Sequence, residues 1–187
     1  MKSFDNVSDL EKILRQALIT QSTLAPERVL NSLSMYGTEL DKLLSENIYE
    51  SIDQNDTTML FELTSREATS DVSMTETQDN DLNLITYYKA FRLKVIMYGN
   101  SSSDIALQLA ARFRTEEVRN DLYEQGIYLE KITDPFIINE YKNETMWLRN
   151  DVDIDIGVKF SFTPITTDAS FANISELNII NEEATNV

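Results

Sequence analysis

The chain has 187 residues, including no Cys, no His, four Gly and three Pro. Without Cys or His it lacks the nucleophile arrangements built on those side chains, the imidazole proton shuttle and the common zinc sites. Its formal net charge of −16 repels nucleic-acid phosphates and anionic lipid. No apolar run approaches the roughly 20 residues that cross a bilayer. The composition predicts a single-core globular protein that stays in the cytoplasm where it is made and is not an enzyme.

Three helices are expected near the N-terminus. Ser8 and Glu11 have the spacing of a capping box, and the residues from Ser8 to Ile19 form an amphipathic helix with one apolar stripe. Pro26 suits the first turn of a second short helix that runs through Leu33 and ends at Gly37. A third helix is expected from Thr38 onward.

Alternating patterns predict strands in the middle of the chain. Met59, Phe61 and Leu63 alternate with Leu60, Glu62 and Thr64, as in a strand with one well-buried face. Residues 66–83 are polar and acidic, which predicts a long hairpin or loop that leaves the body of the domain. A long strand is then expected from Tyr87 to Tyr98, with four apolar residues on one face and Arg92 and Lys94 on the other.

Two further helices and a short strand are predicted next. Ser101 to Ser103 offer an N-cap for a helix that extends to Phe113, and Thr115 opens another helix with an acidic first turn. Gly126 occupies the position expected for a glycine just beyond a helix end. A short strand is expected at residues 127–129, and the dipeptide Asp134-Pro135 prevents it from continuing.

The clearest alternation is in residues 152–162, where Val152 to Phe162 place every second, apolar side chain on one face. Asp153 and Asp155 fall on the other face, so the strand is expected to be half exposed. Residues 164–187 are acidic with scattered apolar side chains. They form either a frayed terminus or an arm that orders against a neighbouring subunit.

The sequence offers no convincing chemical site. The aspartates at 151, 153 and 155 imitate the start of a calcium loop, but Gly157 comes one place too late and Phe162 stands where a glutamate is needed. The arginines Arg112, Arg114 and Arg119 could meet a phosphate, or they could pair with Glu116, Glu117 and acidic neighbours, within the molecule or across a subunit boundary. We therefore expect no catalytic residue, no metal and no cofactor.

Taken together, the predicted elements form an α+β fold, with an antiparallel β-sheet flanked by helices over residues 1–163 and an acidic arm over 164–187. Residues 88–132 and 139–162 resemble the phage neck or tail-terminator family. The signatures are a strand that ends in Tyr98-Gly99, an Ala/Leu-rich helix through Phe113, a Gly-x-Tyr-Leu turn containing Gly126 and Tyr128, and a Trp-x-Arg strand start containing Trp147 and Arg149. The last signature departs from the family by one inserted residue before Asp151.

The resemblance implies a non-enzymatic virion protein of the tail or neck, assembled in the host bacterial cytoplasm. It implies a homohexameric ring that caps the tail tube, contacts the tube protein and the head-completion protein, and contacts the sheath if the tail is contractile. DNA would pass through the bore without specific binding. A head-completion (stopper) protein, another tail subunit, and an acidic regulator that mimics DNA remain alternatives.

A head-to-tail ring needs two complementary surfaces on each subunit. We expect a basic side made of Arg92, Lys94, Arg112 and Arg114 to meet acidic loops of the next subunit. The 66–83 hairpin or the C-terminal arm would reach a neighbour. The alternative is that both segments are solvated surface.

Overall fold

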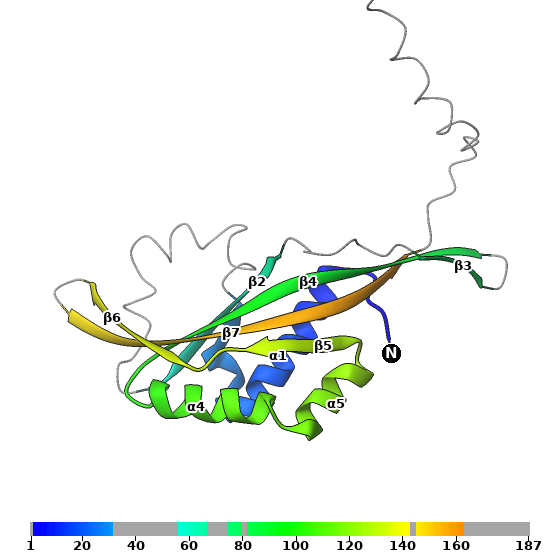
Figure 1. The fold of residues 1–187 in the computed structure, drawn as a ribbon. Coiled ribbons are helices and arrows are strands. Elements are labelled where there is room, and N and C mark those ends of the chain that lie inside the picture. Colours follow the sequence, from blue (N-terminus) through cyan, green and yellow to red (C-terminus); the bar gives the residue numbers. More distant parts are fainter. Residues whose placement is uncertain (1, 32–55, 67–74, 80–81, 143–144, 163–187) are drawn as a thin grey trace, which may run out of the picture.

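The structure is a computed structural model that describes residues 2–31, 56–66, 75–79, 82–142 and 145–162 (Figure 1). The described residues form an α+β fold in which three α-helices lie on one face of a mixed β-sheet. The elements in chain order are α1 (Val7–Ser22), η1 (Pro26–Arg28), β1 (Val29–Asn31), β2 (Thr58–Ser65), β3 (Thr75–Asp79), β4 (Leu82–Tyr98), α4 (Ser102–Phe113), α5 (Glu116–Glu124), β5 (Ile127–Ile132), β6 (Phe136–Lys142) and β7 (Thr145–Phe162).

Two long central strands, β4 and β7, organise the sheet. They have 17 and 18 residues and pair antiparallel, so each spans about 55–60 Å at about 3.3 Å per residue. The strand order is β1-β2-β4-β7-β5, with β3 paired to the start of β4 and β6 paired to the start of β7. The pairing of β1 with β2 is parallel. The sheet is therefore longer than the helical layer, and the β3–β4 and β6–β7 hairpins extend at its two ends (Figure 1).

The hydrophobic core lies between the sheet and the helices. The predicted stripes of α1, α4 and the long strands are confirmed, because the same apolar positions are buried together. Phe160 is central at one end of this core, where its ring stacks on Tyr87 with 5.3 Å between centroids and packs at an angle on Phe4 and Phe91. The principal core residues are Leu10, Leu14, Leu18, Phe61, Leu93, Val95, Leu109, Phe113, Ile154 and Ile156.

The N-terminal segment departs from the prediction in two places. The N-cap of α1 is Asn6, whose side chain accepts a hydrogen bond from the backbone N–H of Asp9 at 2.9 Å, so the capping box predicted at Ser8 is wrong. The helix predicted from Pro26 to Leu33 is also wrong. Only one 3₁₀ turn forms there, because Val29 and Leu30 pair with β2 as a parallel edge strand. The rest of that predicted helix and the helix from Thr38 lie outside the described residues.

The strands are more extensive than the sequence indicated. Strand β4 begins at Leu82 rather than Tyr87, and its first residues pair with Thr75–Asp79 in a hairpin. Strand β7 begins at Thr145 rather than Val152, because its first half pairs with β6, a strand that was not predicted. These segments lack a clean alternation, and cross-strand pairing determines their conformation. Residues 67–74 and 164–187 lie outside the described parts of the chain.

The two predicted helices after β4 are confirmed. Thr115 caps α5 by accepting from the backbone N–H of Val118, whereas Ser101 makes no side-chain bond at the start of α4. Instead, the buried Asn150 of β7 donates to Ser102 Oγ at 2.8 Å and fixes the first turn of α4 on the sheet.

Two glycines occupy turns that require their conformational freedom. Gly126 has φ +93°, and a Cβ there would lie 2.5 Å from the carbonyl oxygen of Lys2. Gly99 has φ +115°, and its Cβ would clash with the backbone of Asp56. A residue with a side chain would be strained at either position.

Candidate subunit-contact surface

The face of the sheet away from the helices carries positive side chains on β4 opposite negative side chains on β7. On β4 this face bears Arg92 and Lys94, and β7 places Asp155 opposite the first and Asp153 opposite the second. Directly opposed residues in an antiparallel sheet share a face and lie close enough to interact. The pairing register therefore builds a cross-strand set of ion pairs.

One end of this set is centred on Asp155, whose side chain is 7% exposed. Arg92 donates two hydrogen bonds to it, at 2.8 Å and 3.3 Å, and Arg66 approaches the same carboxylate at 3.1 Å. Arg66 also bonds to Glu130 of β5 at 3.1 Å. The hydrogen bonds to Asp155, together with its negative charge, raise the pKa of Arg92 above its usual value. The buried carboxylate of Asp155 thus joins Arg92 of β4 to Arg66, which follows β2, and Arg66 extends the contact to Glu130.

The other end is centred on Asp151, whose side chain is fully buried. Arg149 binds it with two hydrogen bonds, at 2.7 Å and 2.6 Å, and Lys94 lies 3.7 Å away. Glu140 of β6 lies 3.8 Å from Arg149 and accepts a hydrogen bond from the Tyr98 hydroxyl at 3.1 Å. The bonds to Asp151 raise the pKa of Arg149 above its usual value. Two parallel hydrogen bonds from one guanidinium to one carboxylate give the strongest and most directional ion pairs.

We call these side chains the ionic ladder. Its members are Arg66, Arg92, Lys94, Glu130, Glu140, Arg149, Asp151, Asp153 and Asp155. The prediction of a half-exposed strand face is wrong for Asp155, which is buried and paired with arginines, and Asp151 on the same face is buried and paired as well. Alternation reveals which residues share a face, but it does not reveal what covers them. The described residues hold no cluster of three acidic side chains arranged for a metal ion.

The four basic residues predicted to form one side of the protein lie on two sides. Arg92 and Lys94 belong to the ionic ladder, whereas Arg112 and Arg114 lie at the end of α4, on the helical side (Figure 1). Arg112 donates to the carbonyl oxygen of Gln21 at 2.7 Å. Arg114 bonds to Asp134, also at 2.7 Å.

The predicted pairing of the α4–α5 arginines with Glu116 and Glu117 is not found in this described region. Arg114 does pair with an acid, Asp134, but it also donates to a backbone carbonyl, that of Ile132. Arg119 of α5 donates to the carbonyl oxygen of Leu129 on β5. These arginines therefore tie the helices to neighbouring backbone and do not form a free basic cluster.

Three of the family-signature residues meet at one end of the ionic ladder. The rings of Tyr98 and Trp147 pack edge to face with 6.4 Å between centroids, and Tyr98 and Arg149 both contact Glu140. Gly99 and Gly126 serve the turns described above, and Tyr128 is an exposed residue of β5. Sequence reasoning missed the roles of Arg66, Glu130 and Glu140, because no local pattern marks a residue whose partner lies on a distant strand.

The hairpin of β6 and β7 also exposes apolar side chains. Tyr141 pairs with Met146, and Ile137 lies further along β6 on the same face. These three side chains are 60–70% exposed. Exposed apolar groups on a projecting hairpin are a common feature of protein–protein contact surfaces.

The described helices include none long and apolar enough to cross a membrane. Among the described residues, the charged side chains on the outer face of the sheet form a set of structural ion pairs. The sequence model for the phage neck terminator protein family matches residues 8–183, which is almost the whole chain. The chain therefore belongs to the phage neck terminator family, whose members are structural proteins of the tail and neck of the virion and act with other neck and tail proteins. No curated protein matches the chain.

Proposed function

We propose that this protein assembles as a six-fold ring on the head-proximal end of the tail tube, stops further tube polymerisation and presents a surface to the head-completion protein. The observation that carries the proposal is the family match over residues 8–183. A protein that terminates a tube must bind the last tube ring on one side and leave a passage for DNA. The ring form meets both requirements.

The two-sided arrangement of basic residues supports a head-to-tail ring. Each subunit of a closed heterologous ring uses two different surfaces, one for each neighbour. The ionic ladder with Arg92 and Lys94 lies on the sheet side, and Arg112 and Arg114 lie on the helical side. We assign these two sides to the two subunit contacts. The same basic groups already bind partners within the subunit, so acidic loops of the adjacent copy would approach the parts of Arg92 and Arg114 that stay exposed, 43% and 44% of their side chains.

The net charge suits a passage for DNA. Six copies at −16 each carry a formal charge of −96. An acidic wall repels the phosphate backbone, so DNA slides through without adhering. A bore lined by neutral side chains, with the acids directed outward, would contradict this part of the proposal.

The first test is assembly of the purified protein. Light scattering and negative-stain microscopy should show rings with the mass of six chains, either in solution or after tail tubes are added. Purified protein added to elongating tail tubes should give capped tubes of fixed length. A persistent monomer that leaves tube growth unchanged would overturn the proposal. A monomer or dimer that binds only a basic enzyme would also overturn it, because that is the behaviour of an acidic regulator that mimics DNA.

The subunit contact can be tested with matched charge reversals. Arg114 forms an exposed ion pair with Asp134, and Lys12 forms a comparable exposed pair with Asp9. Arg114→Glu should weaken ring assembly, because it places a negative charge where the acidic loop of a neighbour docks. Lys12→Glu makes the same charge change on the same helical side, but early on α1 rather than at the end of α4, and should leave assembly unchanged. Equal effects of the two variants would argue against the assignment of the contact to the end of α4.

A further inference from the structure

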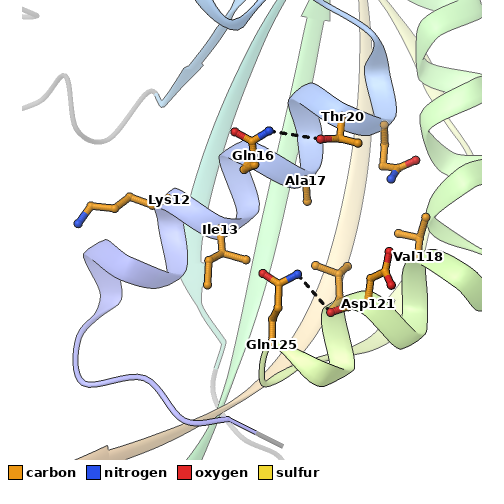
Figure 2. Close-up of a pocket in the computed structure, with 10 residues that line it drawn as sticks. Lys12, Ile13, Gln16, Ala17, Thr20, Val118, Asp121 and Gln125 are labelled. Atoms are coloured by element: carbon orange, nitrogen blue, oxygen red, sulfur yellow. Dashed lines mark hydrogen bonds between the residues drawn. The ribbon is translucent and has the colours of Figure 1, made fainter.

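A groove of about 290 Å³ lies between α1 and α5 (Figure 2). Its apolar lining residues are Ile13 and Ala17 of α1 and Val118 and Leu122 of α5. Polar side chains surround them, among them Gln16 and Gln125. An apolar floor within a polar rim is the usual composition of a site that binds another segment of protein.

The groove exists because the two helices pack on different partners. Helix α1 packs on α4, whereas α5 packs on β5. The axes therefore separate, and the side chains of Ile13 and Ala17 remain only partly buried although they adjoin the core. No element among the described parts of the chain fills the space between them.

We propose that the groove binds the segment from Phe171 to Ile180 of the same chain. Large apolar residues recur in this segment at every third position, namely Phe171, Ile174, Leu177 and Ile180. The family match extends through residue 183, so the segment belongs to the part of the chain that matches the family. These four side chains, together with Ile179, lose contact with water when they occupy an apolar floor, and this burial supplies the driving force.

The path from the sheet to the groove is short. Strand β7 ends at Phe162, and the backbone of Phe4, just before α1, is hydrogen-bonded to Lys159 and Ser161 of that strand. Gly126, just after α5, lies against the backbone of Lys2. The end of β7 thus adjoins both the start of α1 and the end of α5.

Residues 163–170 provide the linker. Eight extended residues span up to about 26–29 Å. A short tether of this kind gives an effective concentration in the millimolar range, above that of free neighbouring copies. The groove of the free subunit should therefore hold the segment of its own chain.

Cysteine cross-linking of the full chain tests this assignment, since the protein has no native Cys. Gln16→Cys places a thiol on the groove rim, and Leu177→Cys places one in the segment. Mild oxidation should give an intramolecular disulfide, seen as a monomer of altered mobility on a non-reducing gel. The matched control combines Leu177→Cys with Tyr88→Cys, an exposed position on the ladder side of β4. The groove pair should react at least about tenfold faster than the control pair.

Two further variants test the apolar contact without altering the described fold. In the groove pair, Ile174→Asp should reduce the rate of disulfide formation to that of the control, and Ser175→Asp should leave it unchanged. Equal rates for the groove and control pairs would overturn the proposal. Disulfide-linked dimers would also overturn it, because they would make a neighbouring copy the occupant. The assay uses the free subunit, so its outcome does not depend on ring formation.

Discussion

The ion pair between Arg149 and Asp151 should be the most sensitive polar contact in the described structure. The Asp151 side chain is fully buried, and Arg149 supplies both of its short hydrogen bonds. Arg149→Met would leave a buried carboxylate with only Lys94, 3.7 Å away. Removing one partner of a buried pair costs about 3–5 kcal/mol. For a chain of this size, this corresponds to a decrease in Tm of roughly 6–20 °C.

Arg92→Met is the matched comparison. It removes an arginine from Asp155, but Arg66 remains 3.1 Å from that carboxylate. The side chain of Arg92 is also 43% exposed, which weakens its contribution. We expect a loss of about 1 kcal/mol, near the upper end for exposed ion pairs.

Urea denaturation measures both losses in one experiment. Trp147 is the only tryptophan and is buried against Tyr98 at the same end of the ladder, so its fluorescence reports unfolding. The free energy of unfolding should fall much more for Arg149→Met than for Arg92→Met. Equal losses, or a loss below about 1 kcal/mol for Arg149→Met, would refute the reasoning that burial and the number of partners set the cost.

Three further predictions concern local structure and can be checked by thermal unfolding. Gly126→Ala should cost about 1–3 kcal/mol, because φ is positive and the backbone is close. Gly157→Ala should cost less, because its Cβ would lie 3.2 Å from the end of the flexible Glu130 side chain and in ordinary contact with Tyr128. Thr115→Ala should cost about 1 kcal/mol as a lost cap, and Ser101→Ala, which removes no cap bond, should cost well under half as much. The hydrogen bond from the Lys12 ammonium, aided by Asn6, lowers the pKa of Asp9, so its stabilisation is present at neutral pH and is lost as the pH falls. The Tm difference between wild type and Asp9→Asn should therefore shrink between pH 7 and about pH 2.

The sequence by itself determined the elements whose pattern is local. A helix face follows from apolar residues three and four apart, so the stripes of α1 and α4 were predicted from Leu10 to Phe113 without reference to the rest of the chain. Alternation did the same for the buried faces of β2, β4 and β7. The resemblance in the signatures from Tyr98 to Arg149 identified the family, which the match over residues 8–183 confirmed.

Only the tertiary structure decided which elements pair and what covers each face. Val29 and Leu30 follow a proline that suits a helix, yet they form β1 because β2 offers a parallel strand to pair with. Strand β6 has no clear alternation and exists because it pairs with β7. The aspartates of β7 looked solvated in the sequence, but Asp151 is buried against Arg149, and Asp155 binds Arg66 from far along the chain. Such pairs depend on strand order and register, which are long-range properties that no local period encodes.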